Sequence, residues 1–411
     1  MKINQRLFNE FEIGIVLCYI FLLIFGTLAI YSATLNNPFA VEVFPKQIFF
    51  ISLSFLILIA VYFLHPLYLK QLAIPIYVLS IIFLLVVLFK GKIVYGQKSW
   101  LQFGIFGFQP SELAKVGIVF LLAKLFSEKK IDPNTIQGLI IVAAVCLIPL
   151  VLVLLEPDMG TSLIIIFVIA TMLFWNGLSL FGAFILSMPM ICAFASFFGT
   201  YAILTVLFFV AAGIIYFKKD IFVSSSILAL NVGAVFLPDF LMKFLKPHQQ
   251  KRIMAFLNAE LDPLGSGYNA IQAKTAVGSG GLLGKGFLKG SQTQLRFVPE
   301  QWTDFIFCVI SEEFGFIGSV ALIIAFIILL NRILKVALMI KDKDTFSSFV
   351  AMAAFAIIFA HFFINIAMSV GLLPIIGIPL AFVSYGGTSL LINTFLLASV
   401  LNIYKNRKYY S

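Results

Sequence analysis

Residues 265–313 read GSGYNAIQAKTAVGSGGLLGKGFLKGSQTQLRFVPEQWTDFIFCVISEE, and this stretch decides how the rest of the chain is interpreted. It lies across the longest polar interval of the chain, which meets the next apolar run at Asp304. A carboxylate at such a boundary is costly to hold near lipid, so it needs a functional or structural reason. The residue types leave two roles open for Asp304: a general base that faces water at the membrane surface, or a cap for the helix that starts there.

The composition around this stretch is that of a membrane protein. Of the 411 residues, 62% are apolar and only 11% are charged, and the mean hydropathy is +1.09. A soluble domain carries about a quarter of charged residues. Apolar runs of roughly 20 residues match the hydrocarbon core of a bilayer, whereas the alternating segments of a membrane barrel are not seen. The sequence therefore predicts a single all-α polytopic membrane domain over residues 1–411.

We expect twelve spans and both termini in the cytoplasm. In this arrangement the short loops rich in Lys and Arg fall on the cytoplasmic side, as the positive-inside rule requires. A large loop, residues 242–303, then lies outside the cytoplasm. The expected spans are residues 12–33, 47–65, 71–89, 108–127, 137–155, 161–176, 181–198, 201–217, 222–241, 304–330, 347–369 and 380–403.

Two outer segments, residues 90–100 and 243–296, keep basic residues against the positive-inside preference. Such charges suggest an anionic ligand at the outer face, although solvated loop charge would leave the same pattern. No internal repeat stands out, which disfavours a transporter built from matching halves.

Residues 98–115, KSWLQFGIFGFQPSELAK, carry a second polar signal. Trp100 lies near the start of a span, where interfacial aromatic residues are common. Glu112 and Lys115 are three residues apart on an expected helix, so they share one face and we expect them to form an ion pair. The pair is either a structural tie or one wall of a polar cavity. We favour the cavity, because apolar packing could replace a tie.

Other familiar sites are weak or excluded. The glycine-rich segment 278–286, GSGGLLGKG, fails the Walker pattern, which leaves a flexible phosphate-binding loop or a plain re-entrant turn. The acidic turn at 156–161 lacks a full set of cation ligands, and no cluster has zinc spacing. Ser384 lacks the partners of a serine nucleophile. His361 and Asn365, one helical turn apart, fit an interhelical hydrogen bond better than a catalytic pair.

Seven motifs recur in the order in which they occur in a known family. They are QPSE (109–112), PDMGT (157–161), DPLGSGY (262–268), PE followed by TDF (299–305), EEFG (312–315), GIPL (377–380) and SYGG (384–387). Together they resemble the SEDS family, named for shape, elongation, division and sporulation, over about residues 10–405. Residues 290–294, GSQTQ, look more like the RodA branch of that family than the FtsW branch.

The resemblance implies a peptidoglycan glycosyltransferase of cell elongation. It implies that lipid II, an undecaprenyl-pyrophosphoryl disaccharide-pentapeptide, is polymerised into β-1,4 glycan on the outer face of the bacterial inner membrane. Implied partners are a class B penicillin-binding protein and the elongation machinery with the MreB cytoskeleton, and no nucleic acid. No cofactor is evident, and a divalent cation is not supported by a ligand cluster. A lipid II flippase, an FtsW-type division paralogue and a non-catalytic scaffold are the alternatives.

The family's essential aspartate falls on Asp304, with the implied role of general base for the acceptor hydroxyl. Four basic residues are candidates to stabilise the leaving pyrophosphate: Lys98, Lys115, Arg252 and Lys285. The further candidates for substrate binding are Trp100, Glu112, Glu300 and Ser384.

Three features depart from the family pattern. Trp302 stands where the family usually has His, and Ser99 stands where Arg is common, with Lys98 one residue earlier. The family typically has ten spans, whereas residues 181–241 are expected to hold three spans where one is usual. Two extra spans preserve parity, so residues 242–303 stay outside.

Overall fold

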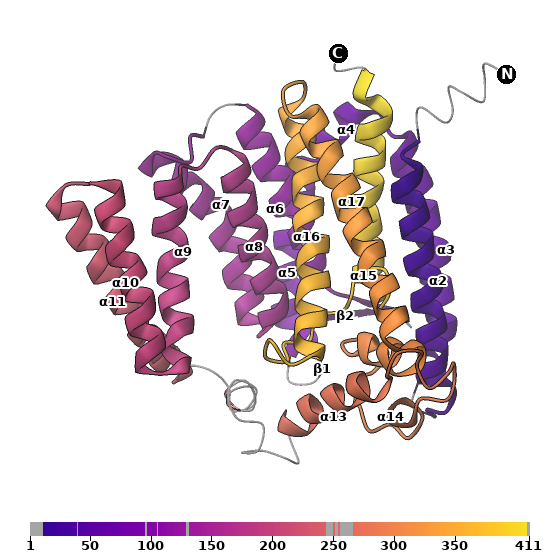
Figure 1. The fold of residues 1–411 in the computed structure, drawn as a ribbon. Helices are drawn as coiled ribbons and strands as arrows, with labels where there is room; N and C mark the ends of the chain where they lie inside the picture. The colour runs from indigo at the N-terminus through magenta and orange to yellow at the C-terminus, as the bar shows by residue number, and fades with distance from the viewer. Residues whose placement is uncertain are drawn as a thin grey trace. The chain divides into compact units, whose positions relative to one another are not determined.

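The computed structural model describes residues 11–38, 40–94, 97–104, 106–128, 131–243, 250, 254 and 266–408. The chain divides into two compact units, one made of Met1–Trp175 with Asn269–Ser411 and the other of Asn176–Tyr268. Both are built from helices (Figure 1). The predicted all-α polytopic architecture is thus confirmed.

The larger unit contains most of the helices and one small sheet. Before the smaller unit the chain forms α2 (Ile13–Leu35), α3 (Val43–Phe63), α4 (Pro66–Gln71), α5 (Ala73–Lys90), β1 (Lys92–Val94), β2 (Gln97–Phe103), β3 (Phe106–Phe108), α6 (Pro110–Ser127), α7 (Ile136–Leu155) and α8 (Met159–Trp175). After it come α13 (Ser266–Ser279), α14 (Ser291–Gln294), α15 (Ile306–Ile340), α16 (Thr345–Ser369), α17 (Gly387–Lys405) and the short η3 (Asn406–Lys408). The strands pair antiparallel in the order β1-β2-β3, a sheet that the hydropathy pattern did not predict.

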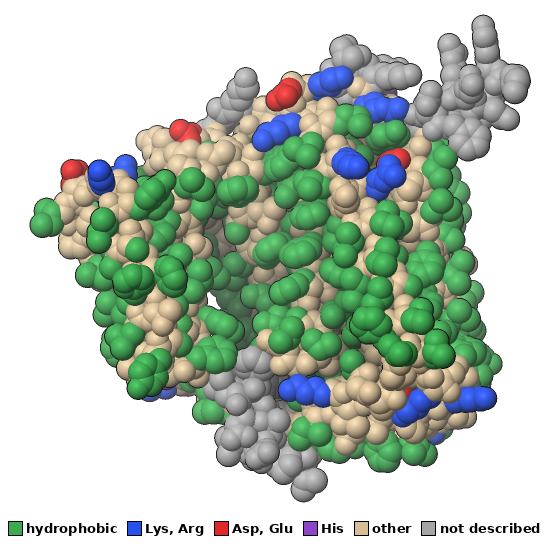
Figure 2. Space-filling model, viewed as in Figure 1, with side chains coloured by type: hydrophobic (Ala, Val, Ile, Leu, Met, Phe, Trp, Pro, Cys, Tyr) green, Lys and Arg blue, Asp and Glu red, His purple; other side chains and the backbone are tan. Residues whose placement is uncertain are grey.

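Each of the twelve expected spans corresponds to a helix, but not every helix meets the criteria for a span. Among the described residues, ten helices are long and apolar enough to cross a membrane. The two others are α8, which has 17 residues, and α6, which carries Glu112, Lys115 and Lys124. The count of twelve spans therefore remains a prediction. On the face of the larger unit in Figure 2, hydrophobic side chains cover the middle and charged side chains lie toward the ends, as expected for a protein in a bilayer.

Helix starts follow signals that the sequence carries. Pro110 occupies the first turn of α6, where its missing N–H costs nothing. Thr135 caps α7 by accepting the N–H of Gly138 on its hydroxyl oxygen at 3.0 Å. Local sequence thus sets where these helices begin, while their packing depends on distant residues.

The centre of the larger unit is formed by α16 and α17. In both helices 72% of the most apolar 18-residue stretch is buried, compared with 22% in α5. Helix α17 packs against α3, α16 and α6, and α16 packs against α15, α8 and α6. Polar ties cross this core: the Tyr19 hydroxyl lies 3.0 Å from the hydroxyls of both Ser54 and Thr394, joining α2, α3 and α17. Such ties orient helices in an apolar medium that gives little hydrophobic drive for their association.

Helix α15 is broken at Gly315, which has a φ of 67°. The glycine-rich segment 278–286 fills the break with its backbone. Lys285 and Gly286 donate their N–H groups to the carbonyls of Glu312 and Glu313, at 2.9 and 3.0 Å. A Cβ on Gly284 would collide with the Glu313 carbonyl, so a larger residue does not fit there. These N–H groups serve the helix, which favours the turn over the phosphate-binding loop.

The described part of the smaller unit contains α9 (Leu180–Ala195), η1 (Ser196–Phe198), α10 (Thr200–Phe217) and α11 (Ile221–Met242). Its core is formed by Cys192, Val210, Ile227 and Ala234. Within it the buried Asn231 accepts the Cys192 thiol at 3.3 Å, which ties α9 to α11. The three helices match the expected division of 181–241. That two of these helices are an insertion relative to the ten spans typical of the family stays a prediction.

Candidate active site

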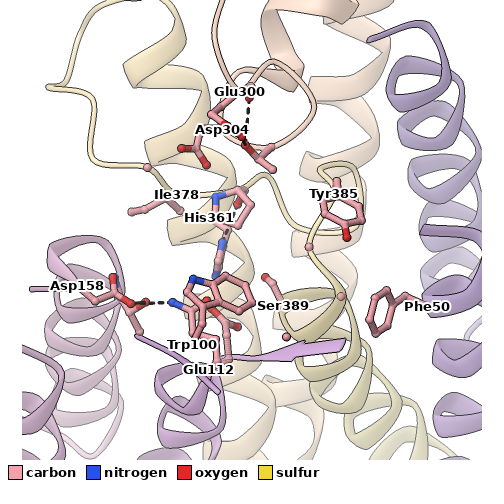
Figure 3. A pocket seen from close by; sticks show the side chains of 18 of the residues that line it. Phe50, Trp100, Glu112, Asp158, Glu300, Asp304, His361, Ile378, Tyr385 and Ser389 are labelled. Carbon is pink, nitrogen blue, oxygen red and sulfur yellow. Dashed lines mark hydrogen bonds between the residues drawn. The ribbon is translucent and has the colours of Figure 1, made fainter. Parts of the chain in front are cut away.

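A pocket with a volume of about 390 Å³ lies within the larger unit (Figure 3). It is bounded by α3, the β2-β3 hairpin, α6, α8, α16, the turn before α15 and the segment before α17. Its titratable lining residues are Lys46, Glu112, Asp158, Glu300, Asp304, His361 and Tyr385. Phe50, Trp100 and Phe106 supply aromatic walls. Side chains from distant parts of the chain thus meet in one polar cavity with apolar sides.

Asp304 lines the pocket from the turn that precedes α15. The helix begins at Ile306, and its N-cap is Phe305, which makes no side-chain cap. Asp304 is therefore not the N-cap residue of this helix, and its role as a general base stays a prediction. Its carboxylate packs close to Gly377, where a Cβ would lie 3.2 Å from Asp304 Oδ2.

Glu112 and Lys115 form the expected ion pair, with 2.8 Å between Lys115 Nζ and Glu112 Oε1. Only 3% of Glu112 and 1% of Lys115 are exposed. Glu112 lines the pocket, and its Oε2 has no hydrogen-bond partner among the described residues. A buried carboxylate oxygen without a donor is costly, so a ligand hydroxyl or N–H would be favoured there. The pair thus forms one wall of a cavity, with Lys115 behind Glu112.

His361 joins this pair from α16. Its Nδ1 lies 2.8 Å from the Pro379 carbonyl oxygen, which can only accept, so Nδ1 carries the proton. Its Nε2 is then free to accept from Lys115 Nζ at 2.9 Å. His361 therefore makes the expected interhelical hydrogen bond, which joins α16 to Lys115 on α6. His361 and Asn365, on one face of α16, each bond to partners outside that helix.

Asp158 anchors the acidic turn at 156–161 in the pocket wall. Its carboxylate accepts Gln109 Nε2 at 2.8 Å, Ser111 Oγ at 3.1 Å and the N–H and hydroxyl of Thr161 at 3.0 and 2.8 Å. Glu156 is fully buried, and neither carboxylate oxygen has a hydrogen-bond partner among the described residues. Burial, helped by the nearby Asp158 charge, raises the pKa of Glu156 to about 9, so it is neutral at pH 7.

Four predicted substrate-binding residues do not line the pocket, and one of them is Lys115, which lies behind Glu112. The Lys98 ammonium donates to the Leu88 and Phe89 carbonyls at 2.7 and 3.1 Å and so caps the end of α5. The Lys285 ammonium pairs with Glu312 at 2.7 Å. The Ser384 hydroxyl donates to the Thr303 carbonyl at 2.6 Å and supports the turn that carries Asp304. Each polar group is used to hold the fold together.

The remaining predicted residues have mixed positions. Trp100 and Glu300 line the pocket, as Asp304 and Glu112 do. Arg252 lies outside the described residues. Among these residues, no group of three or more His, Cys, Asp or Glu side chains is placed to hold a metal ion.

Lys46 is a pocket residue that sequence reasoning missed. It lies in the first turn of α3, and its ammonium pairs with Glu42 at 2.6 Å. Glu42 is 80% exposed, so the pair is solvated and weak, and the Lys46 charge stays available to a ligand. The only signal in the sequence was its basic charge on the expected outer face, outside the two segments that drew attention.

The pocket combines groups for one kind of chemistry. A carboxylate at Asp304 can take a proton from a hydroxyl, and cationic Lys46 can stabilise an anion that leaves. Glu112 can orient hydroxyl or amide groups of a polar ligand. This arrangement fits transfer of a group from an anionic carrier to a hydroxyl acceptor.

Comparison with known proteins gives consistent matches over most of the chain. A family model for FtsW, RodA and SpoVE, described as "Cell cycle protein", matches residues 12–198 and 181–409. Peptidoglycan glycosyltransferase MrdB of Escherichia coli K12 is 32% identical over 389 residues, covering 94% of this chain and 91% of the relative. Peptidoglycan glycosyltransferase RodA of Treponema pallidum is 30% identical over 430 residues, covering 95% and 98%.

Solved structures show the same fold. A chain from the work described as "Structural coordination of polymerization and crosslinking by a peptidoglycan synthase complex" superposes with a TM-score of 0.73 at 25% identity, covering 97% of this chain and 98% of that one. The crystal structure of the rod shape determining protein RodA from Thermus thermophilus gives a TM-score of 0.63 at 23% identity, with 97% of each chain covered.

Proposed function

Because this chain belongs to the FtsW, RodA and SpoVE family of cell cycle proteins, we propose that it is a peptidoglycan glycosyltransferase of cell elongation. It is a multi-pass inner membrane protein, in keeping with its apolar helices and with the MrdB and RodA relatives. The FtsW-type division paralogue is not favoured, since the first relatives carry the names MrdB and RodA.

The observation that carries the proposal is the pocket that joins Asp304 to Lys46 and to the Glu112–Lys115 pair. The substrate is lipid II, whose pyrophosphate is anionic and whose sugars offer hydroxyl and amide groups. A single cavity with a carboxylate, cations and aromatic walls suits such a molecule.

The reaction is a displacement at the donor sugar. The acceptor GlcNAc 4-hydroxyl gives its proton to the Asp304 carboxylate as its oxygen attacks C1 of the donor MurNAc. The C1–O bond to the pyrophosphate breaks, and undecaprenyl pyrophosphate leaves with the bonding electron pair. Attack from the opposite face inverts the α-linked donor into a β-1,4 linkage. Lys46, with Lys115 behind Glu112, supplies positive charge where the leaving anion develops.

The partners follow from the same assignment. We place a class B penicillin-binding protein beside this chain to crosslink the new glycan, as part of an elongation machinery with the MreB cytoskeleton. Support comes from a structural neighbour described as a peptidoglycan synthase complex that coordinates polymerization and crosslinking. Both termini lie in the cytoplasm in this arrangement, so the pocket opens toward the outer face where lipid II is polymerised.

The test is polymerisation of lipid II by the protein purified together with the class B penicillin-binding protein of the same organism. Asp304→Ala should lower the rate by about 10²–10⁴-fold, the usual contribution of a general base. Asp342→Ala, an exposed aspartate just beyond the far end of α15, is the matched control and should not change the rate. Equal rates for both variants would refute the role of Asp304.

Two further arms separate the alternatives. Headgroup translocation in liposomes that needs no partner and is unaffected by Asp304→Asn would support a lipid II flippase instead. Rates measured with and without a chelator show whether a divalent cation takes part.

A further inference from the structure

Asn365 is fully buried on α16, and both of its amide hydrogens are used on segments that border the pocket. Its Nδ2 donates to the main-chain carbonyl of Asp304 at 2.8 Å and to that of Ile378 at 2.7 Å. Neither acceptor belongs to a helix. One side chain therefore holds the turn that carries Asp304 against the segment that precedes α17.

Resting on the proposed function, we propose that Asn365 is a positioning residue, which sets the place of the Asp304 carboxylate through the backbone. The amide does not need to touch substrate for this role. One of its two bonds holds the carbonyl oxygen of Asp304, and the other holds that of Ile378. Since a misplacement of about 1 Å at a reacting group can cost 10²-fold in rate, such a fixed point matters for catalysis.

The segment before α17, to which Asn365 bonds at Ile378, is also hydrogen-bonded to the turn that carries Asp304. Tyr385 donates its N–H to the Trp302 carbonyl at 2.8 Å, and the Ser384 hydroxyl donates to the Thr303 carbonyl at 2.6 Å. Ser384 Oγ in turn accepts the N–H of Leu380 at 2.8 Å. The carbonyls of three consecutive residues, 302 to 304, thus all accept a bond from this segment or from Asn365. The turn is held along its length.

Gly377 packs next to the Asp304 carboxylate. It has a φ of 80°, and a Cβ there would lie 3.2 Å from Asp304 Oδ2, inside the usual contact distance. The carboxylate therefore packs against the backbone of Gly377. Asn365 bonds to the next residue of the same segment, Ile378. A shift of that segment would move the surface against which Asp304 packs.

Helix α16 uses the same face to hold the cationic side of the pocket. One turn before Asn365, His361 bonds to Pro379, the residue after Ile378, and to the Lys115 ammonium. Residues four apart on a helix lie on one face, so a single rigid helix sets both the candidate base and the Glu112–Lys115 pair. Of the two residues on this face, Asn365 is the one that bonds to the main chain of Asp304.

The experiment measures kcat and KM for lipid II polymerisation by Asn365→Ala and Asn365→Ser, each purified with the class B penicillin-binding protein. A serine hydroxyl at this position bonds back to its own helix and does not reach the two carbonyls. If one variant fails to fold, the other carries the test. Both should lower kcat by about 10–100-fold and leave KM within about threefold, because substrate contacts are untouched.

Ser369→Ala is the matched control. Ser369 is also fully buried on α16, and its hydroxyl bonds to the main-chain carbonyl of Asn365 within the helix at 2.8 Å. Its removal should leave kcat unchanged. Amide exchange in residues 299–306 and 376–386 should rise in the Asn365 variants and not in this control, since the Tyr385 N–H loses its fixed acceptor.

The outcomes separate the positioning role from the proposed function. Wild-type kcat in a folded Asn365 variant, or a drop in thermal stability with an unchanged rate per folded molecule, would return Asn365 to a purely structural role. A wild-type protein that makes no glycan, with Asp304→Ala indistinguishable from it, would instead refute the proposed function. The exchange measurement would then still decide whether Asn365 holds the turn.

Discussion

Lys115→Met separates the structural and catalytic contributions of the buried ion pair. The substitution keeps the length of the side chain and removes its charge. It leaves the Glu112 carboxylate, which is 3% exposed, without the ammonium 2.8 Å away, and His361 Nε2 loses its donor. Both effects follow from one lost cation.

The size of the effect follows from burial. Because both partners are almost fully buried, breaking the pair leaves an uncompensated charge, which costs about 3–5 kcal/mol in comparable cases. Because Glu112 Oε2 has no hydrogen-bond partner among the described residues, no second donor there compensates for the lost ammonium. Adding Glu112→Gln removes the uncompensated charge as well. The double variant should therefore recover most of the stability, so that the losses of the two single variants do not add.

The assay combines stability with rate. Unfolding of the single variants and the double variant is followed in detergent, and lipid II polymerisation is measured for each at a temperature where it is folded. The double variant should be nearly as stable as the wild type and at least about 100-fold slower, the usual cost of removing one group that stabilises a developing anion. A double variant with full activity would show that the pair is a structural tie, and additive losses of stability would refute the ion pair as drawn.

Two further predictions concern residues around the pocket. Lys46→Ala should raise the KM for lipid II several-fold and weaken its dependence on ionic strength, whereas Lys98→Ala, which removes a helix-capping lysine outside the pocket, should leave KM unchanged in the same assay. Glu156 has a pKa raised from 4.5 in an exposed setting to about 9 in the fold. The folded state therefore holds this proton more tightly, and its contribution to stability, complete below about pH 4.5, is lost as pH rises toward 9. Glu156→Gln should accordingly raise the thermal stability at pH 8 and change it little at pH 5, and an equal effect at both pH values would contradict a neutral Glu156.

Properties that depend on neighbours along the chain could be predicted from the sequence. Hydropathy located every long helix, since crossing a bilayer needs about 20 consecutive apolar residues. The Glu112–Lys115 pair followed from a spacing of three on one helix. The ordered motifs placed the chain in its family and drew attention to Asp304. The hairpin that carries Trp100 was not expected, because its short strands leave little trace in hydropathy.

The roles of single polar side chains could not be predicted in the same way. Lys98 and Lys285 look like candidates for binding an anion as long as only their charge is known. In the fold, the Lys98 ammonium bonds to the end of α5 and the Lys285 ammonium pairs with Glu312. Lys46 drew no attention, although it lies in the pocket with Asp304. A charge stays available to a ligand when the fold places it in the pocket and pairs it only weakly, as the solvated Glu42 carboxylate does for Lys46.

The sequence by itself determined the membrane-spanning helical architecture and the family, and it singled out Asp304 as a candidate, because these depend on local composition and on motifs in order. The tertiary structure decided which groups stand beside Asp304. It brought Asn365 to the Asp304 carbonyl and His361 to Lys115, pairs that lie 61 and 246 residues apart along the chain. Helix packing sets those distances, and the packing depends on contacts of the whole bundle. For the stretch at 265–313, the chain itself marks where an unusual carboxylate lies, and the fold supplies the neighbours that hold it in place.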